Sequence, residues 1–389
     1  MNTITVSREY GAGGAEVARH LAERLGWELL DRELLQQAAH VERLDAAELD
    51  RLDEKPITLV ERFRLYPKHQ HYLEGLRKVA RQAAEKGRMI LVGRGTHQLL
   101  ADIPGVFHLR LMAPREWRAR RMAQIEGWPL QTALVRCTQE DHHREQFTRY
   151  FFGEQALEPT AYHAVFNTGW VPLNHVVDCV AAVVSGTAEE PHREPGKSAV
   201  LTLARELGAG ETTFARALAP RLGLTICDRE LLEQEAARLG VPVTRLEKID
   251  EQPDSLFERI CPGSLHQSYF DALQKIMKER AAQGNVLLVG RGGSRFLRDW
   301  PNAFHVRLVA PLEDRVRRVM EHRWQREDRA RQLIAESDSS RRQFYQSYFG
   351  ANWADPLEYH LTVNTARLGA AALDLVARAA SLYWKRHDA

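Results

Sequence analysis

The chain has 389 residues, of which 44% are hydrophobic and 27% are charged, and its formal net charge is +2. This balance is typical of a globular protein with two domains, and it lacks the strongly basic character of a dedicated nucleic-acid-binding protein. No apolar run approaches the roughly 20 residues that a membrane-spanning helix needs, and the N-terminus shows no signal-peptide pattern, so we expect a cytoplasmic protein without nucleic-acid or membrane partners.

The first predicted elements are a strand and a helix joined by a glycine-rich turn. Ile4 and Val6 indicate the strand, and apolar residues recur at helical spacing from Val17 to Leu25. Glycines in such a turn let backbone N–H groups approach an anion, and the helix N-terminus adds the positive end of its dipole. If the turn binds an anion, nucleotide phosphates bind at Arg8, Gly11, Gly13 and Gly14. The alternative is a turn with a purely structural role.

The turn departs from the standard phosphate-binding loop, G-x-x-x-x-G-K-[ST]. In that loop the lysine contacts the β- and γ-phosphates and the hydroxyl group contacts Mg²⁺. Here Arg8 replaces the first glycine, Gly14 replaces the lysine and Ala15 replaces the hydroxyl residue. If side chains also bind phosphate, arginine is the expected residue, because its guanidinium group binds phosphate oxygens bidentately.

Four more strands are predicted in the first half, alternating with helical segments. Short apolar runs lie at 27–30, 89–92, 107–112 and 164–167. Strands that alternate with helices in this way indicate a parallel, doubly wound sheet flanked by helices. Such sheets bind their ligands at the carboxyl ends of the strands.

The second half of the chain repeats the first with a constant offset of 197 residues (201 minus 4, 290 minus 93). The run ITVSRE at 4–9 is echoed by LTLARE at 201–206, and VGRG recurs. Residues 185–197 are rich in Pro, Glu and Gly, which indicates an exposed linker. We therefore predict two domains of one fold, at 1–184 and 198–389, and we expect the two repeats to pair within the chain.

Charged residues follow the second and third predicted strands. Arg94 lies between two glycines at a strand end, where it could clamp the phosphate of an acceptor molecule. Asp31 and Arg32 could contact the acceptor as well. The alternative for Asp31 is a cap on the following helix, and a solvated side chain is the alternative for Arg32.

Two further charged pairs lie on the predicted helices after the fourth strand. Arg118 and Arg121 are three residues apart and share a helix face, so they could close over a transferring phosphoryl group. A solvated basic face would have the same pattern. Asp141 and Arg144 have the same spacing, for which a surface ion pair is the simplest interpretation.

Several of these motifs together resemble the nucleoside monophosphate kinases, and most closely the bacterial cytidylate kinase-like family. The resemblance covers nearly the whole of both halves and rests on SREYGAGG at 7–14, VGRG at 92–95, APREWRARR at 113–121 and the D-x-x-R pair at 141–144. It implies a P-loop kinase core, the use of ATP and Mg²⁺, and transfer of the γ-phosphoryl group to a nucleoside monophosphate such as CMP.

With this resemblance, the candidate site residues fall into three groups. The catalytic candidates are Arg94, Arg118, Arg121, Asp141 and Arg144. In the second half, the phosphate-loop candidates are Gly208, Gly210 and Thr212. The substrate-binding candidates are Asp31, Arg32, Arg94, Asp228, Arg229, Arg291, Arg315, Arg318, Asp338 and Arg341. No metal ligands are predicted among the side chains, because the histidines and cysteines lack a suitable spacing.

The two phosphate loops differ at the position of the standard lysine. The second half has Glu211 there, and a like charge about 4 Å away costs roughly 4 kcal/mol at an effective dielectric constant of about 20. We therefore expect the first half to be the active site, and we expect Gly14→Lys to strengthen ATP binding. Three alternatives stay open: a nucleotide-binding protein without turnover that acts as a sensor or scaffold, complementary sites in the two halves, and another small acceptor.

Overall fold

The structure, a computed structural model, describes residues 1–31, 59–93, 95–187, 198–210, 212–228, 265–290 and 292–387. Within these ranges the side chains of 59–69, 72, 212, 265–269 and 387 lie outside the description. The chain divides into two compact units, residues 1–188 and 189–389, which we call the first and the second unit. The predicted linker stays a prediction, because 188–197 lie outside the described residues.

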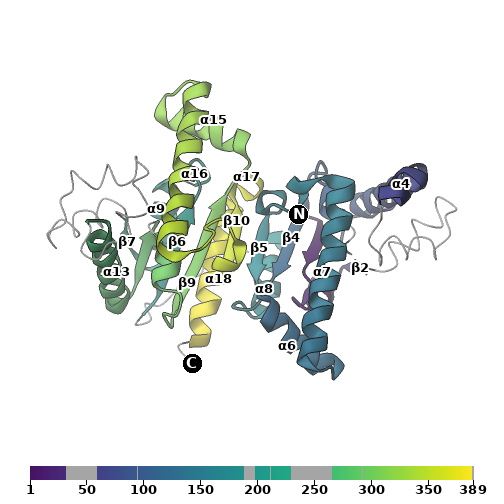
Figure 1. Cartoon of the computed structure of the whole chain (residues 1–389), viewed down its shortest axis with the longest axis horizontal. Coiled ribbons are helices and arrows are strands. Elements are labelled where there is room, and N and C mark those ends of the chain that lie inside the picture. The colour runs from purple at the N-terminus through teal and green to yellow at the C-terminus, as the bar shows by residue number, and fades with distance from the viewer. Residues whose placement is uncertain are drawn as a thin grey trace. The chain divides into compact units, whose positions relative to one another are not determined.

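The first unit alternates strands and helices (Figure 1). Its strands are β1 (Thr3–Arg8), β2 (Glu28–Leu30), β3 (Met89–Val92), β4 (Val106–Met112) and β5 (Ala164–Asn167). Its helices are α1 (Gly14–Leu25), α4 (Leu59–Lys86), α5 (Thr96–Leu99), α6 (Arg115–Glu126), α7 (Leu130–Phe152) and α8 (Leu173–Ser185), with short 3₁₀ turns at Glu154–Leu157 and Pro159–Ala161.

The second unit follows the same order of elements. Its strands are β6 (Val200–Arg205), β7 (Thr225–Cys227), β8 (Val286–Val289), β9 (Ala303–Val309) and β10 (Leu361–Asn364). Its helices are α9 (Thr212–Leu222), α13 (Leu265–Gln283), α14 (Gly293–Phe296), α15 (Leu312–Arg323), α16 (Glu327–Phe349), α17 (Thr365–Leu368) and α18 (Ala371–His387), with a 3₁₀ turn at Pro356–Glu358.

Each unit contains a parallel sheet with its first strand in a central position. The order in the first unit is β2-β3-β1-β4-β5, and all four pairings are parallel. The second unit has the order β7-β8-β6-β9-β10, again with parallel pairings. The predicted doubly wound parallel fold is therefore confirmed. The chain changes direction across the sheet at β1 and at β6, and such a switch point is where these folds bind ligands.

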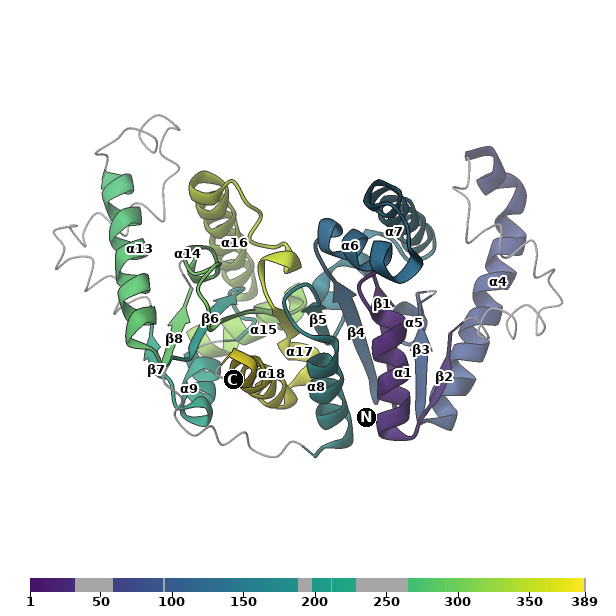
Figure 2. The same cartoon turned by 90° about the horizontal axis from the view of Figure 1, so that it is seen from below.

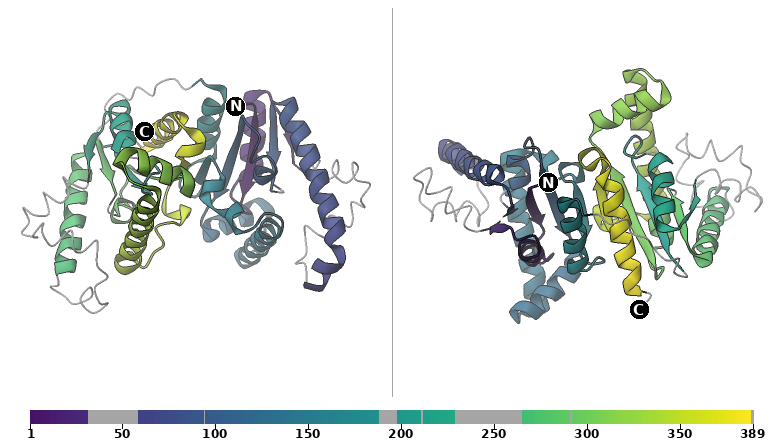
Figure 3. Two further views of the ribbon diagram at one scale, coloured as in Figure 1. Left: turned by 90° about the horizontal axis from the view of Figure 1, so that it is seen from above. Right: turned by 180° about the vertical axis from the view of Figure 1, so that it is seen from behind.

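Helices cover both faces of each sheet, because the central strands are apolar on both sides. In β3, Met89 and Leu91 belong to one core cluster with the buried face of α4 and with Phe147 of α7, whereas Ile90 alternates to the other face. There α1 packs beside α8, as Figure 2 shows. In the second unit α9 packs in the same way against α18, the yellow helix of Figure 3.

Buried histidines complete the core beneath the sheet ends. The backbone N–H of His108 donates to His163 Nδ1 at 3.0 Å, and the same bond joins His305 to His360 at 3.0 Å. Because Nδ1 of His163 and Nδ1 of His360 accept these hydrogen bonds, neither atom carries a proton. Burial also lowers the pKa of His305 to about 3. Separately, none of the helices in the described ranges combines the length and apolar character needed to cross a bilayer.

Candidate nucleotide site

The glycine-rich turn of the first unit joins the carboxyl end of β1 to the N-terminus of α1. Gly11 has φ +79° and Gly13, which precedes the helix, has φ +85°, so both occupy the left-handed region that favours glycine. No side chain caps α1 at Gly13. The first N–H groups of a helix have no partner within it, so this helix start is suited to an anion.

Close packing behind the turn also requires glycine. A Cβ atom at Gly11 would lie 2.9 Å from Cγ of Met122, and one at Gly13 would lie 2.6 Å from Cδ1 of Leu173. At Gly14 it would lie 2.6 Å from Cγ of Arg8. The stem of Arg8 therefore fills the place next to Gly14, and the expected benefit of Gly14→Lys meets a steric obstacle that the sequence did not reveal.

Arg118 fixes the turn through hydrogen bonds made by its buried side chain. Its side chain is only 6% exposed and lies 3.3 Å from the Glu9 carboxylate. Its guanidinium group donates to the backbone carbonyls of Ala113 at 2.7 Å and Tyr10 at 2.9 Å, and to Asp141 at 2.5 Å. These contacts direct Arg118 into the protein. They favour a role in fixing the turn over the predicted role of closing over a transferring phosphoryl group.

Asp141 and Glu9 hold the backbone on either side of Arg118. Asp141 accepts a hydrogen bond from the Tyr10 N–H at 2.7 Å, and Glu9 accepts one from the Ala113 N–H at 3.0 Å. Burial raises the pKa of the Glu9 carboxyl group, while the nearby Arg118 acts in the opposite direction. The three side chains thus fix the turn to α6 and α7.

Arg121 neutralises the carboxylate of Glu16 at the start of α1. It donates to Glu16, in the first turn of that helix, at 2.6 Å and to the Gly11 carbonyl at 3.3 Å. Because Glu16 is paired, its charge opposes an incoming phosphate less strongly. Arg121 thus supports the phosphate turn through protein contacts.

Arg144 contacts the backbone at the start of the turn, and Arg8 connects the turn to the end of β2. Arg144 donates to the Arg8 carbonyl at 3.4 Å and lies 5.4 Å from the Tyr10 ring centroid. Burial lowers the pKa of Arg144, although nearby carboxylates such as Asp141 act in the opposite direction. The Arg8 guanidinium lies 3.6 Å from Asp31, at the end of β2. Arg8 therefore links the phosphate turn to the predicted acceptor side.

A small cavity lies beside these arginines in the first unit. Its volume is about 70 Å³, and its lining includes Ser7, Arg110, Arg144, Glu145 and Tyr162. Such a volume accommodates a few water molecules or a phosphate group, and it is much smaller than a nucleotide site.

The second unit has the same arginine arrangement. Arg315 donates to the Leu207 carbonyl at 2.8 Å and to both oxygens of Asp338 at 2.8 Å. Arg318 donates to the Gly208 carbonyl at 3.2 Å and to the Thr365 hydroxyl at 2.8 Å. Gly208 has φ +82°, close to the +79° of its counterpart Gly11. The holding arrangement is therefore present in both units.

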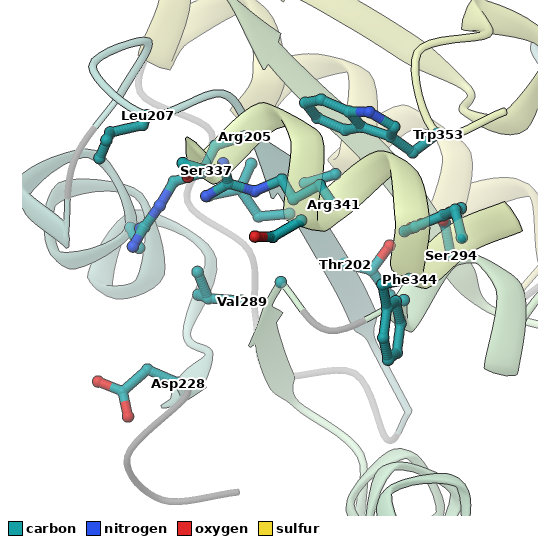
Figure 4. Close-up of a pocket in the computed structure, with 18 of the residues that line it drawn as sticks. Thr202, Arg205, Leu207, Asp228, Val289, Ser294, Ser337, Arg341, Phe344 and Trp353 are labelled. Carbon is teal, nitrogen blue, oxygen red and sulfur yellow. Dashed lines mark hydrogen bonds between the residues drawn. The ribbon is translucent and has the colours of Figure 1, made fainter. Parts of the chain in front are cut away.

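The second unit also contains a large cleft at the carboxyl ends of β6, β7 and β8. Its volume is about 720 Å³, which lies in the range of small-molecule sites. Figure 4 shows Asp228 on one side of this cleft and Trp353 on the other, with Arg205 and Arg341 drawn among the lining residues. We call this cavity the second-unit cleft.

Some predicted site residues fall outside the described part of the chain. These are Arg32, Arg94, Arg229 and Arg291, together with the side chain of Thr212. Their predicted roles stay predictions. The other candidates lie at or near the two phosphate turns, at the ends of β2 and β7 or on the helices that hold them.

Sequence reasoning missed two pairs of residues that fix the turns. Glu9 and its counterpart Glu206 each accept a backbone N–H bond from the loop after the fourth strand of their unit. Thr168 donates to the Ala12 carbonyl at 2.9 Å, and Thr365 donates in the same way to the Ala209 carbonyl. The repeat itself carried the signal, because both residues recur at the constant offset in otherwise diverged halves.

The residues present suit a phosphate-bearing ligand better than an isolated metal ion. Arginine side chains contact the backbone of both turns. Across the described ranges, no group of three or more His, Cys, Asp or Glu side chains could hold a metal. Mg²⁺ usually binds through one or two carboxylates plus substrate phosphates, so the phosphates would provide much of its coordination.

Comparison with known proteins gives the same match for both units. The profile of the cytidylate kinase-like family matches residues 3–169 and again residues 200–367. A cytidylate kinase of Pyrobaculum aerophilum is 28% identical over 170 residues, which are 43% of this chain and 85% of that protein. A cytidylate kinase of Methanopyrus kandleri is 27% identical over 180 residues, which are 44% of this chain and 86% of that protein.

Two solved structures were also found. An uncharacterised protein of Eubacterium ventriosum has a TM-score of 0.37 and 22% identity, covering 48% of this chain and 99% of its own. A shikimate kinase of Bacteroides thetaiotaomicron has a TM-score of 0.30 and 13% identity, covering 47% of this chain and 98% of its own.

Proposed function

Because the chain belongs to the cytidylate kinase-like family, we propose that it transfers the γ-phosphoryl group of ATP to a nucleoside monophosphate. The observation that carries the proposal is the uncapped, glycine-rich start of α1, held by Arg118, Arg121 and Asp141. Phosphoryl transfer depends mostly on positioning and on stabilising negative charge, and this arrangement supplies fixed N–H donors for that purpose.

The side chains of the first unit have two kinds of role, positioning the turn and contacting phosphate. Arg118, Arg121 and Asp141 act as positioning residues, because their contacts are to the turn itself. Arg144, beside the small cavity, would contact the phosphate of the acceptor or the transferring group, together with Arg94. Mg²⁺, when bound with ATP, would neutralise charge on the phosphates.

We assign turnover to the first unit on account of its phosphate turn. Gly14 stands where the second unit has Glu211, so no carboxylate at that position opposes a polyphosphate. The Glu16 carboxylate nearby is paired with Arg121. The small size of the first-unit cavity does not count against ATP, because the nucleotide would lie over the turn rather than inside that cavity.

A coupled assay of ADP formation with ATP, Mg²⁺ and each nucleoside monophosphate tests the proposal. We expect turnover with CMP, and we expect Arg144→Ala to lower kcat/KM by about 10-fold to 100-fold, because hydrogen bonds to charged groups contribute about 1.5–3 kcal/mol. Arg136→Ala is the matched control, since Arg136 is exposed on the same helix. Equal activity of the two variants would contradict the role of Arg144.

The rival function is a nucleotide-binding sensor or scaffold without turnover. The observation that favours it is the lack of a lysine in both phosphate turns, where the residues are Gly14 and Glu211. ATP binding measured by calorimetry, with no ADP formed from any nucleoside monophosphate, would favour this rival. Phosphorylation of another small acceptor would appear as ADP formation only when that acceptor is supplied.

A further inference from the structure

Arg110 lies on β4 and lines the small cavity of the first unit together with Arg144. Its Nη1 donates to the Tyr162 hydroxyl at 3.0 Å, and its buried Nε has no hydrogen-bond partner among the described residues. Within the described ranges no carboxylate lies close enough to form an ion pair with Arg110. This side chain can therefore offer further N–H groups to an anion.

Tyr162 fixes the guanidinium group of Arg110. The Tyr162 hydroxyl donates to the Ala156 carbonyl at 3.2 Å, so its hydrogen is used there and its oxygen accepts from Arg110. Cζ of Arg110 also lies 5.3 Å from the centroid of the Tyr162 ring. Because Tyr162 is only 1% exposed, its own position is set by packing inside the protein.

His97 supports Tyr162 in this position. Nε2 of His97 lies 2.9 Å from the same Ala156 carbonyl, to which it donates because a carbonyl oxygen only accepts. The rings of His97 and Tyr162 are stacked, with their centroids 4.5 Å apart. His97, Tyr162 and Arg110 all line the small cavity, so they form one connected group along its wall.

The counterpart arginine of the second unit is paired inside the protein. Arg307 corresponds to Arg110 through the offset of 197 (307 minus 110), and its side chain is 3% exposed. It donates to Glu206 at 2.8 Å and to the Ala354 carbonyl at 2.9 Å. Arg307 is not one of the described residues that line the second-unit cleft. Its charge is therefore balanced by a carboxylate, whereas the charge of Arg110 is available to a ligand.

Two substitutions accompany this difference between the units. Trp353 stands where the first unit has Ala156, and Cζ of Arg307 lies 4.8 Å from the centroid of a Trp353 ring. Ser294, labelled with Trp353 in Figure 4, stands where the first unit has His97. A serine has no ring to stack on a tyrosine, and an indole attracts a guanidinium group. The second unit thus holds its arginine against Trp353, away from the cleft.

The small cavity lies on the side of the predicted acceptor. Gly93 and Gly95, which flank the predicted acceptor residue Arg94, also line it. Its volume of about 70 Å³ accommodates a phosphate group. Arg110 therefore lies where the phosphate of an acceptor would meet it.

We propose that Arg110 contacts the phosphate group of the acceptor, and that Tyr162 and His97 are positioning residues that keep its guanidinium group at this cavity. The inference rests on the proposed function for the reaction, and it adds a phosphate contact that the sequence patterns did not single out. The corresponding contact is absent from the second unit, because Arg307 is held by Glu206 and Trp353.

The coupled assay with Arg110→Gln tests the phosphate contact. We expect the KM for CMP to rise about tenfold or more, because a charged donor to the phosphate is lost. The KM for ATP should stay within about twofold, because the contact is to the acceptor. Arg110→Lys keeps the charge and should recover part of the affinity, and thermal unfolding checks that both variants are folded.

Tyr162→Phe tests the positioning role, and Tyr359→Phe is its matched control. Each variant removes a buried hydroxyl group that donates to the backbone carbonyl six residues earlier. Tyr162 also accepts from Arg110, whereas Tyr359 is hydrogen-bonded to Tyr345. We expect Tyr162→Phe to raise the KM for CMP about threefold to tenfold and Tyr359→Phe to leave it unchanged. His97→Ser should act as Tyr162→Phe does.

The double variant of Arg110→Gln and Tyr162→Phe separates positioning from a general structural effect. Because Tyr162 acts through Arg110, the second substitution should add nothing to the first. Additive effects, or equal effects of Tyr162→Phe and Tyr359→Phe, would overturn the positioning role. An unchanged KM for CMP in Arg110→Gln would overturn the phosphate contact.

Failure of the proposed function looks different from failure of this inference. The wild-type chain would then form no ADP from any nucleoside monophosphate. Calorimetric titration of the full chain with CMP, UMP, AMP and GMP would still test the contact, because binding of the phosphate group should be weaker in Arg110→Gln. The absence of Arg110-dependent binding by all four nucleotides would overturn the inference.

Discussion

Arg118 and Thr168 stabilise the first phosphate turn through different backbone carbonyls. Arg118 donates to Tyr10 and Thr168 donates to Ala12, so two carbonyls of the turn are fixed by side chains that lie 50 residues apart in the sequence (168 minus 118). Neither side chain needs to contact a ligand in order to affect catalysis. Under the proposed function, the N–H groups of the same peptides would bind a phosphate, so an error in their orientation would weaken charge stabilisation in the transition state.

Thr168→Val tests this positioning role at the scale of one residue. The substitution keeps the shape of the side chain but leaves the buried Ala12 carbonyl without its donor, at a cost of about 1–3 kcal/mol. We expect kcat to fall about tenfold with little change in the KM for the nucleoside monophosphate, measured in the coupled assay. Thr168→Ser, which restores the hydroxyl group, should recover most of the rate. A loss that serine does not rescue would indicate a packing role instead.

The phosphate turn works as one element with α1 and the stem of Arg8. Gly11 packs against α6, Gly13 against Leu173 of α8, and Gly14 against Arg8. The conformation of the turn is therefore fixed by tertiary contacts as well as by the left-handed backbone. This explains how a turn without the standard lysine can still be rigid: the stem of Arg8 packs beside Gly14, and its guanidinium group lies near Gly93 and Asp31.

Gly14→Lys tests this arrangement at the scale of the element. A lysine Cβ at this position would lie 2.6 Å from Cγ and 2.8 Å from Cβ of Arg8, near the base of that side chain. Overpacking of this kind costs about 1–3 kcal/mol, so we expect weaker ATP binding by calorimetry and a lower unfolding temperature. Gly26→Lys is a suitable control, because a Cβ there meets no atom within 4 Å, although φ is +65°. Stronger ATP binding by Gly14→Lys would show that Arg8 moves aside at little cost.

The whole molecule combines two units that share a fold but differ at their sites. In the first, Gly14 stands at the lysine position of the phosphate turn and the cavity is about 70 Å³, whereas the second has Glu211 at that position and a cleft of about 720 Å³. Each unit has its own core, with α4 packed on β3 in one and α13 on β8 in the other. The two units thus share a fold but differ in charge and in open space at the carboxyl ends of their strands.

Expression of residues 1–188 alone tests the independence of the first unit. Because this unit contains five paired strands and its own core, we expect it to fold cooperatively and to bind ATP with the affinity of the full chain. Thermal unfolding and calorimetry measure both properties. A fragment that is unfolded or that self-associates would instead support the prediction that the two repeats pair within the chain.

The sequence predicted the fold because its signals are local. Alternating apolar runs and helical periodicity placed β1, β3, β4 and β5 within a few residues of their bounds, and the constant offset revealed the second unit. The family resemblance is confirmed by the profile matches. Glycine spacing also located the turn between β1 and α1, since a turn between a strand and a helix depends on residues that are neighbours in the chain.

Only the tertiary structure decided what the arginines contact. Arg118 meets Tyr10, 108 residues away, and Tyr10 in turn meets Asp141, 131 residues away. Hydrophobic periodicity does not reveal such pairs. An arginine in a sequence also does not show whether its guanidinium group will be buried or solvated. The obstacle at Gly14 and the large cleft of the second unit depend likewise on packing between distant elements. Local patterns fix where strands and helices form, whereas the partners of a long charged side chain depend on which elements the fold brings together.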